Sequence, residues 1–271
     1  MKKIITISFL TFLTNFCFAL KPDRTYKTTP DSLGLNYTKQ VIKTDDNARL
    51  NAWIINPLEA QNNETTMILS YGDAGNMSYW LNQAAILSQV GFTVVLFDYR
   101  GFGQSSDFEM NPEQLYYNEF ATDLETVIKW TKQNLKFKKL GILALSMGTI
   151  ITTIAVQNEK VDFIIGEGFV LNPNEIKEKL FKFKQKNIVL PASSENYIHL
   201  IPKIDIPMLL FSGTLDNFTT VEDSKLIVQQ KPNRKLVEFT GNHLEGFAVL
   251  SGEYYGSKYI QVMDEFLRKI K

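Results

Sequence analysis

The run of residues 139–151 constrains this chain more than any other stretch. It passes from an apolar strand pattern through a turn of small residues into an apolar helix pattern, with Ser146 at the corner. Ala144 and Gly148, two positions before and after the serine, are small enough for strand and helix to approach closely. Such a bend holds the serine Oγ out of the sheet, beside the backbone N–H of Met147. The run predicts a nucleophile with one oxyanion donor; an ordinary turn that contains a serine is the alternative.

Apolar runs alternate with helix patterns on both sides of this corner. Besides the strand that leads to Ser146, buried strands are predicted at residues 66–70, 92–97, 161–165, 206–211 and 235–239. Helices are predicted directly after the serine and at residues 79–90, 113–135, 221–230 and 258–270. This alternation implies an α/β fold with a mostly parallel, doubly wound sheet. Two further strand patterns, at residues 39–43 and 49–55, predict an antiparallel hairpin at its N-terminal edge.

Residues 169–204 break the alternation. Lysines at positions 177, 179, 182, 184 and 186 interleave there with leucine and phenylalanine, ahead of a polar loop. We expect a short lid insertion within a single domain that covers residues 20–271, a length that one α/β core can fill. The alternative is a solvated basic surface helix, because runs of lysine usually face water.

The first nineteen residues have the pattern of a secretory signal peptide. Two lysines precede an apolar run, and cleavage after Ala19 would leave Cys17 and Ala19 at the two positions where the peptidase requires small residues. We expect removal of residues 1–19 and a periplasmic or secreted protein without a stable transmembrane anchor. A lipoprotein acylated at Cys17 is the alternative, which the bulky Phe16 disfavours.

Composition narrows the classes of partner. The chain carries 29 lysines and arginines against 29 aspartates and glutamates, so no overall positive field points to nucleic acid. Cys17 is the only cysteine, and a processed protein would therefore have neither a disulfide nor a thiol nucleophile. Neither H-E-x-x-H nor a complete G-x-G-x-x-G occurs, and we predict no metal and no cofactor.

A serine hydroxyl is a weak nucleophile that needs a base within hydrogen-bond reach. The chain has two histidines. His243 follows the last predicted strand in a glycine-containing loop, whereas His199 lies in an apolar stretch of the predicted lid. A lone histidine among apolar neighbours is usually a packed residue, and a loop at the carboxyl edge of the sheet can present its side chain to Ser146. We therefore predict that His243 is the base.

The base in turn needs a carboxylate that orients its ring. Asp216 comes directly after the strand at residues 206–211, so it is presented at the same edge as Ser146 and His243. Glu167, at the end of the preceding strand, is the alternative candidate for this acid. If Asp216 is the acid, we expect Glu167 to lie near the substrate pocket, and we expect Tyr71 there as well. The three candidates occur along the chain in the order Ser, Asp, His. This is the order of catalytic triads in which the serine lies on a sharp turn from a strand into a helix. Two other aspartates, at positions 98 and 123, are predicted to be structural.

The second oxyanion donor is expected from the loop after residues 66–70, which contains Gly72 and Gly75. We predict that the backbone N–H groups of Asp73 and Met147 form the oxyanion hole. A carboxylate beside a developing oxyanion would be unfavourable, so the Asp73 side chain must turn away or pair with a cation. Arg100 is the predicted partner.

Several segments together resemble the α/β-hydrolase superfamily, and within it the Bem46-like group of serine hydrolases. Y-G-D-A-G-N at residues 71–76 is similar to that group's H-G-N-A-G-N, and residues 96–105 are similar to its D-Y-R-G-x-G-x-S strand and loop. The elbow and residues 212–216 and 241–243 complete a likeness that runs from about residue 39 to the C-terminus. The resemblance implies an α/β-hydrolase sheet, cofactor-free hydrolysis, and the roles of nucleophile, acid and base for Ser146, Asp216 and His243.

Three residues depart from that group's pattern. Tyr71 replaces a histidine, Asp73 an asparagine and Ala144 the first glycine of the elbow, so we expect a differently wired oxyanion loop. The overall expectation is an exported serine hydrolase that cleaves an ester or thioester of a small or acyl-type substrate through an acyl-enzyme on Ser146. The alternatives are an exopeptidase or amidase, with Glu167 as anchor for a charged terminus, and a non-catalytic binding module derived from the same fold.

Overall fold

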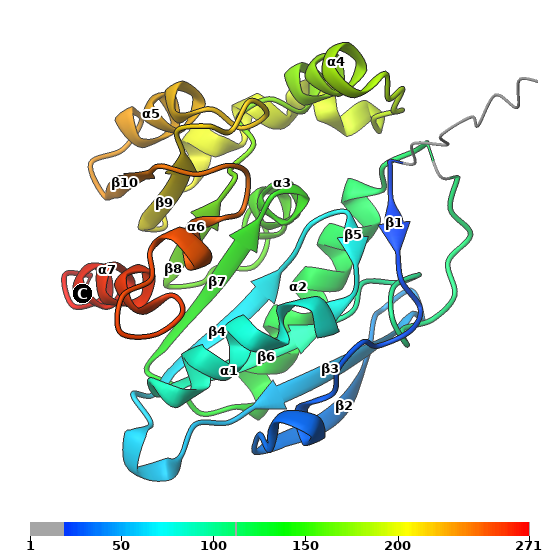
Figure 1. Ribbon diagram of the computed structural model, residues 1–271. Coiled ribbons are helices and arrows are strands. Elements are labelled where there is room, and N and C mark those ends of the chain that lie inside the picture. The colour runs from blue at the N-terminus through cyan, green and yellow to red at the C-terminus, as the bar shows by residue number, and fades with distance from the viewer. Residues whose placement is uncertain (1–18, 112, 271) are drawn as a thin grey trace, which may run out of the picture.

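A computed structural model describes residues 19–111 and 113–270, so the predicted signal peptide lies outside the described residues except for Ala19 (Figure 1). Eight strands form the central sheet, in the order β10-β9-β8-β7-β4-β6-β3-β2. They are β2 (Tyr37–Lys43), β3 (Arg49–Ile55), β4 (Thr65–Ser70), β6 (Phe92–Phe97), β7 (Lys139–Leu145), β8 (Phe163–Glu167), β9 (Met208–Gly213) and β10 (Arg234–Phe239). Neighbours from β10 to β6 run parallel, whereas β3 is antiparallel to both β2 and β6. The predicted sheet, with its antiparallel N-terminal edge, is confirmed.

Helices cover both faces of this sheet, as a doubly wound fold requires. The helices that pack on it are α1 (Leu81–Gln89), α2 (Tyr117–Asn134), α3 (Met147–Ala155), α5 (Val221–Gln229) and α7 (Ser257–Leu267). In Figure 1, α2 and α3 lie on one face, and α1 and α7 lie on the other. Every residue of β4 is buried, because strands covered on both faces expose neither row of side chains.

The insertion between β8 and β9 contains α4 (Pro173–Lys184), η4 (Ala192–His199) and η5 (Ile201–Lys203). The N-terminus of α4 is capped by Asn172, whose side chain accepts a hydrogen bond from the N–H of Asn174. Figure 1 shows α4 beyond the edge of the sheet at which β7 ends. Tyr197 fastens the insertion to the body of the protein: its ring is buried and its hydroxyl donates to the Thr153 hydroxyl of α3 over 3.2 Å.

The structure differs from the predicted elements mainly at their ends. The helix predicted at residues 79–90 begins as a 3₁₀ turn, η3 (Met77–Trp80), because the Asn76 side chain caps it by accepting from the N–H of Ser78. Helix α2 begins at Tyr117 instead of residue 113. A small parallel pair, β1 (Lys21–Pro22) with β5 (Ala74–Gly75), was not predicted, since two-residue strands carry no apolar pattern.

Candidate active site

Ser146 occupies a strained turn between β7 and α3. Its backbone has φ 53° and ψ −121°, in the left-handed half of conformational space that residues with a side chain rarely adopt. The close approach predicted from small residues is present at Gly148, where an added Cβ would lie 1.9 Å from the Ser70 carbonyl oxygen. The Ser146 N–H donates to the Glu167 carbonyl of β8 over 3.0 Å, which ties the bend to the neighbouring strand.

The structure brings Ser146, His243 and Asp216 into one chain of hydrogen bonds. His243 Nε2 lies 2.8 Å from Ser146 Oγ, and His243 Nδ1 lies 2.6 Å from Asp216 Oδ2. An ionised carboxylate only accepts, so Nδ1 carries the proton and Nε2 is free to accept from the serine hydroxyl. The three side chains come from loops that follow β7, β9 and β10, which end at the same edge of the sheet.

Asp216 is held ionised by its own loop. Its carboxylate accepts from the backbone N–H groups of Phe218, over 2.8 Å, and Thr219, over 3.1 Å, and from the Thr219 hydroxyl over 2.5 Å. Burial by itself would raise the pKa of this carboxyl, but the hydrogen bonds from His243, Thr219 and Phe218 outweigh burial and leave the pKa below its ordinary value. The prediction missed Thr219, although a threonine three residues after an aspartate is a common local hydrogen-bonding pattern.

Two backbone segments meet in front of the serine hydroxyl. Met147 is the first residue of α3, so its N–H has no partner within the helix. The loop after β4 lies against the serine as well, because a Cβ added at Gly72 would be 3.5 Å from Ser146 Cβ and 4.0 Å from its Oγ. Asp73, the next residue, lines the same cavity as Ser146 and Met147. The structure thus brings the two predicted donor residues to one place.

The predicted pairing of Asp73 with Arg100 is wrong. Arg100 instead donates to Asp123 over 2.7 Å and to Asp46 over 2.6 Å, and the arginine and Asp123 are both buried. The cation near Asp73 is Lys186, whose Nζ lies 3.9 Å from Oδ2 of the aspartate. The Arg100 side chain therefore joins α2 to the turn between β2 and β3.

Tyr71 and Glu167, the expected pocket residues, lie behind the site instead of in its cavity. Tyr71 is fully buried and its hydroxyl donates to Asp98 Oδ1 over 3.2 Å, an interior role for both side chains. Glu167 is 2% exposed and its Oε1 accepts from the N–H of Gly246 over 2.6 Å. Burial raises the pKa of Glu167 to about 7. His199 is exposed on η4 and does not line the cavity, so the choice of His243 over His199 agrees with the geometry.

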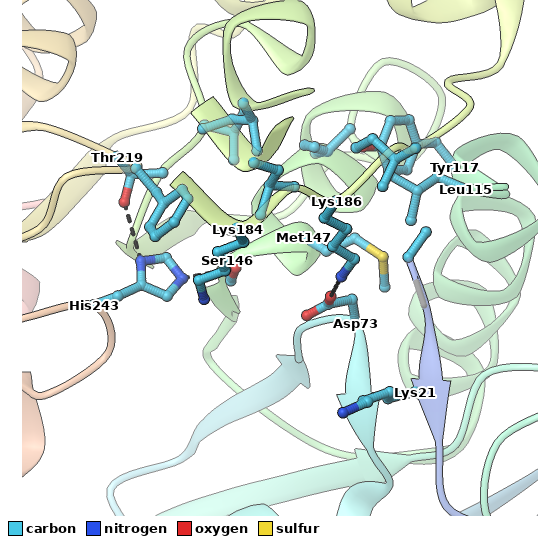
Figure 2. Close-up of a pocket in the computed structure, with 17 residues that line it drawn as sticks. Lys21, Asp73, Leu115, Tyr117, Ser146, Met147, Lys184, Lys186, Thr219 and His243 are labelled. Carbon is cyan, nitrogen blue, oxygen red and sulfur yellow. Dashed lines mark hydrogen bonds and ion pairs between the residues drawn. The ribbon is translucent and has the colours of Figure 1, made fainter. Parts of the chain in front are cut away.

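A cavity of about 310 Å³ opens beside Ser146 and His243 (Figure 2). Most of its wall is apolar and comes from the start of α2 and the residues before it, from α3, from the insertion and from the loop after β9: Leu115, Tyr117, Met147, Ile150, Val170, Ile176, Leu180, Ile188 and Phe218. Its charged lining consists of Asp73 and of Lys21, Lys184 and Lys186. An apolar chamber that reaches a nucleophile is suited to an acyl group or another apolar substrate.

In residues 19–111 and 113–270, no helix is both long and apolar enough to cross a membrane. Nor do the histidines, cysteines and acidic residues in those ranges form a group of three or more that could hold a metal ion.

Comparison with known proteins agrees with this architecture. Residues 65–185 match the family model described as the alpha/beta hydrolase fold. The chain is 25% identical over 277 residues to YfhR of Escherichia coli, covering 96% of this chain and 94% of that protein. It is 22% identical to the alpha/beta hydrolase domain-containing protein WAV2 of Arabidopsis thaliana, covering 90% and 83%. The structure superposes on the Pyrococcus furiosus esterase Pf2001 with a TM-score of 0.74 and 20% identity, covering 93% of this chain and 99% of the esterase. The predicted α/β-hydrolase fold is confirmed.

Proposed function

We propose that this chain, which has the α/β-hydrolase fold, is a serine hydrolase of that superfamily that cleaves an ester or thioester through an acyl-enzyme on Ser146. One observation carries the proposal: the continuous path from Asp216 through His243 to the Ser146 hydroxyl, with both links between 2.6 and 2.8 Å. This path ends at the cavity wall, where a substrate carbonyl can approach Oγ.

The proposed reaction has two halves. Ser146 Oγ attacks the substrate carbonyl carbon while His243 Nε2 takes the hydroxyl proton, and the N–H groups of Met147 and Asp73 donate to the negative oxygen of the tetrahedral intermediate. Collapse breaks the bond to the leaving group, which receives the proton from His243, and leaves the acyl group on Ser146. Water, deprotonated by His243, then adds to the acyl carbonyl. The second tetrahedral intermediate breaks its bond to Ser146 Oγ, which takes the proton back from His243, and the acid product leaves. Asp216 stays ionised and stabilises the imidazolium in both halves.

We propose an apolar acyl group as the part of the substrate that enters the cavity. Aliphatic side chains of two helices contribute to its wall, Ile150 from α3 and Ile176 and Leu180 from α4. Each methylene transferred from water to such a wall contributes about 0.8 kcal/mol to binding. Activity should therefore rise with acyl length until the chamber is full.

The ester and thioester proposal is favoured over the exopeptidase or amidase alternative by the position of Glu167. An exopeptidase or amidase would need Glu167 to bind the charged terminus of its substrate. The Glu167 side chain is buried outside the cavity lining and cannot make that contact. The binding-module alternative is disfavoured by the hydrogen-bond spacing of the three polar side chains. Export after cleavage near Ala19 and membership of the Bem46-like group remain part of the proposal. They are supported by the N-terminal pattern and by the loop motifs respectively.

The test compares the wild type with Ser146→Ala, and uses Ser32→Ala as the matched control because Ser32 is an exposed serine in the turn η1 (Pro30–Leu33). Each protein is labelled with a fluorophosphonate probe and assayed on nitrophenyl esters of increasing acyl length and on aminoacyl anilides. Loss of the nucleophile should abolish labelling and lower kcat by about 10⁶, whereas Ser32→Ala should behave as the wild type. Equal labelling of wild type and Ser146→Ala would reject the proposed nucleophile, and faster cleavage of anilides than of esters would favour the amidase.

A further inference from the structure

The loop after β4, which carries the proposed oxyanion donor, also carries a negative charge on the Asp73 side chain. The proposed reaction places a second negative charge close by. In the proposed reaction Asp73 donates its backbone N–H to the oxyanion, and the residue lines the cavity that contains Ser146 (Figure 2). The carboxylate is only partly solvated, since 43% of the side chain is exposed. A fixed anion at this position raises the energy of the tetrahedral intermediate, whose oxygen becomes negative.

A lysine from the insertion reaches the same place. Gln185 ends α4 in the left-handed conformation, with φ 51°, and turns the chain inward, so that Lys186 and Ile188 are buried. The Lys186 side chain is only 11% exposed, which is unusual for a lysine, and its Nζ lies 3.9 Å from Asp73 Oδ2 (Figure 2). The other two lysines of the cavity lining, Lys21 and Lys184, are exposed.

We propose that Lys186 is a positioning residue for the reaction proposed above. Its ammonium offsets the charge of the Asp73 carboxylate, so that the oxyanion donor on the same residue acts in a neutral environment. The pair also joins the insertion to the loop after β4, and therefore couples the position of the insertion to the oxyanion site. The inference depends on the proposed function, because it assigns Lys186 a role only if Ser146 forms an oxyanion intermediate.

The contact geometry separates this role from substrate binding. Lys186 faces an acid of its own chain, whereas a lysine that binds an anionic substrate is expected to present its ammonium without such a partner. Neutralising Asp73 should consequently remove the need for Lys186. This interdependence is a specific consequence of charge compensation, and neither a general packing role nor a substrate contact produces it.

The experiment is a double-mutant cycle on the full chain, with kcat and KM measured on nitrophenyl butyrate. The variants are Lys186→Met, Asp73→Asn and the two combined, and Lys186→Arg tests whether another cation suffices. Lys186→Met should lower kcat by between tenfold and a hundredfold, less than the roughly 10²- to 10³-fold cost of losing a whole oxyanion donor, with KM changed less than threefold. In the Asp73→Asn background the same lysine substitution should change kcat by less than about threefold, so that the double variant stays within that factor of Asp73→Asn.

Two controls make the result interpretable. Lys177→Met removes an exposed lysine of α4 outside the cavity lining and should leave kcat and KM unchanged. Titration with a fluorophosphonate gives the fraction of active sites in each variant, so that misfolded protein is not counted as slow enzyme.

Three outcomes would overturn the inference. One is a wild-type kcat in Lys186→Met, and another is an equal loss of kcat from that substitution in the Asp73→Asn background. The third is a rise in KM confined to esters with a carboxylated acyl chain, which would make Lys186 a substrate contact. Failure of the proposed function itself is distinct, because in that case the wild type is neither labelled nor active, or Ser146→Ala is as active as the wild type.

Discussion

The buried carboxyl of Glu167 offers a test of how the site is held together. Glu167 ends β8 and links two parts of the site: its carbonyl accepts from the Ser146 N–H over 3.0 Å, and its Oε1 accepts from the Gly246 N–H over 2.6 Å. Gly246 follows closely on the loop that carries His243. The residue therefore connects the serine turn with the histidine loop, and it does so with a side chain that is 2% exposed.

Burial sets the sign and the size of the expected effect. It raises the pKa of Glu167 from 4.5 to about 7. Between these values the folded protein keeps a proton that the unfolded chain has released, so the free energy of unfolding falls as the pH rises from about 4.5 to about 7. Because one pKa unit corresponds to about 1.4 kcal/mol, the ionised carboxylate costs about 3 kcal/mol of stability above pH 7.

The substitution Glu167→Gln removes the ionisation and keeps a carbonyl oxygen that can accept from Gly246. At pH 8 the variant should be more stable than the wild type by up to about 3 kcal/mol, and at pH 4.5 the two should differ by less than about 1 kcal/mol. Urea unfolding followed by tryptophan fluorescence at several pH values measures this difference. Glu253→Gln is the matched control, because Glu253 is exposed, and it should leave the pH dependence unchanged.

The reasoning is refuted if the stabilities of wild type and Glu167→Gln run parallel from pH 4.5 to 8. Parallel curves would mean that Glu167 is solvated in the native protein or that an unrecognised cation neutralises it. A variant destabilised at every pH would show that the hydrogen bond to Gly246 needs the carboxylate itself.

Two further predictions concern the histidine. Thr219→Val removes the hydroxyl that donates to Asp216, and should lower kcat on nitrophenyl esters about tenfold at unchanged fluorophosphonate titre; an unchanged kcat would contradict the role assigned to this hydrogen bond. Gly168→Ala places a Cβ 2.6 Å from His243 Cε1 at φ +62° and should lower kcat at least a hundredfold in the same assay, whereas Gly34→Ala, at φ +63° with nothing within 4 Å, should cost stability alone. Equal kcat values for these two glycine variants would show that the ring moves aside freely.

Most of the fold could be predicted because it follows from apolar runs. Strands covered on both faces consist of nearly continuous aliphatic residues, and their order with the intervening helices implies a parallel sheet. The same reasoning reaches the candidate site, because Ser146, Asp216 and His243 each follow a strand that ends at one edge. The two-residue pair β1 and β5, the short helix α6 (Gly246–Val249), the turn η1 and some helix ends were missed, because caps and short contacts decide these elements.

The remaining contacts could not be predicted because they depend on where side chains of different elements meet. The sequence analysis names Arg100 as the partner of Asp73, but α2 supplies Asp123 and the turn between β2 and β3 supplies Asp46 as its acids. Lys186 belongs to a run of lysines, a pattern that is typical of a solvated surface helix. Its burial follows from the left-handed turn at Gln185, and no periodicity signals that turn.

The contacts made by the sheet and the contacts made by the insertion have different roles in the proposed site. The hydrogen bonds from Asp216 to His243 and from His243 to Ser146 depend on strands of the sheet, whose core does not change with the substrate. The cavity wall and the neutralisation of Asp73 depend on the insertion, which is attached to α3 through contacts such as that of Tyr197 with Thr153. Substitutions in the insertion should therefore alter which acyl group is accepted and how well the oxyanion is stabilised, while the nucleophile remains competent to react with a fluorophosphonate.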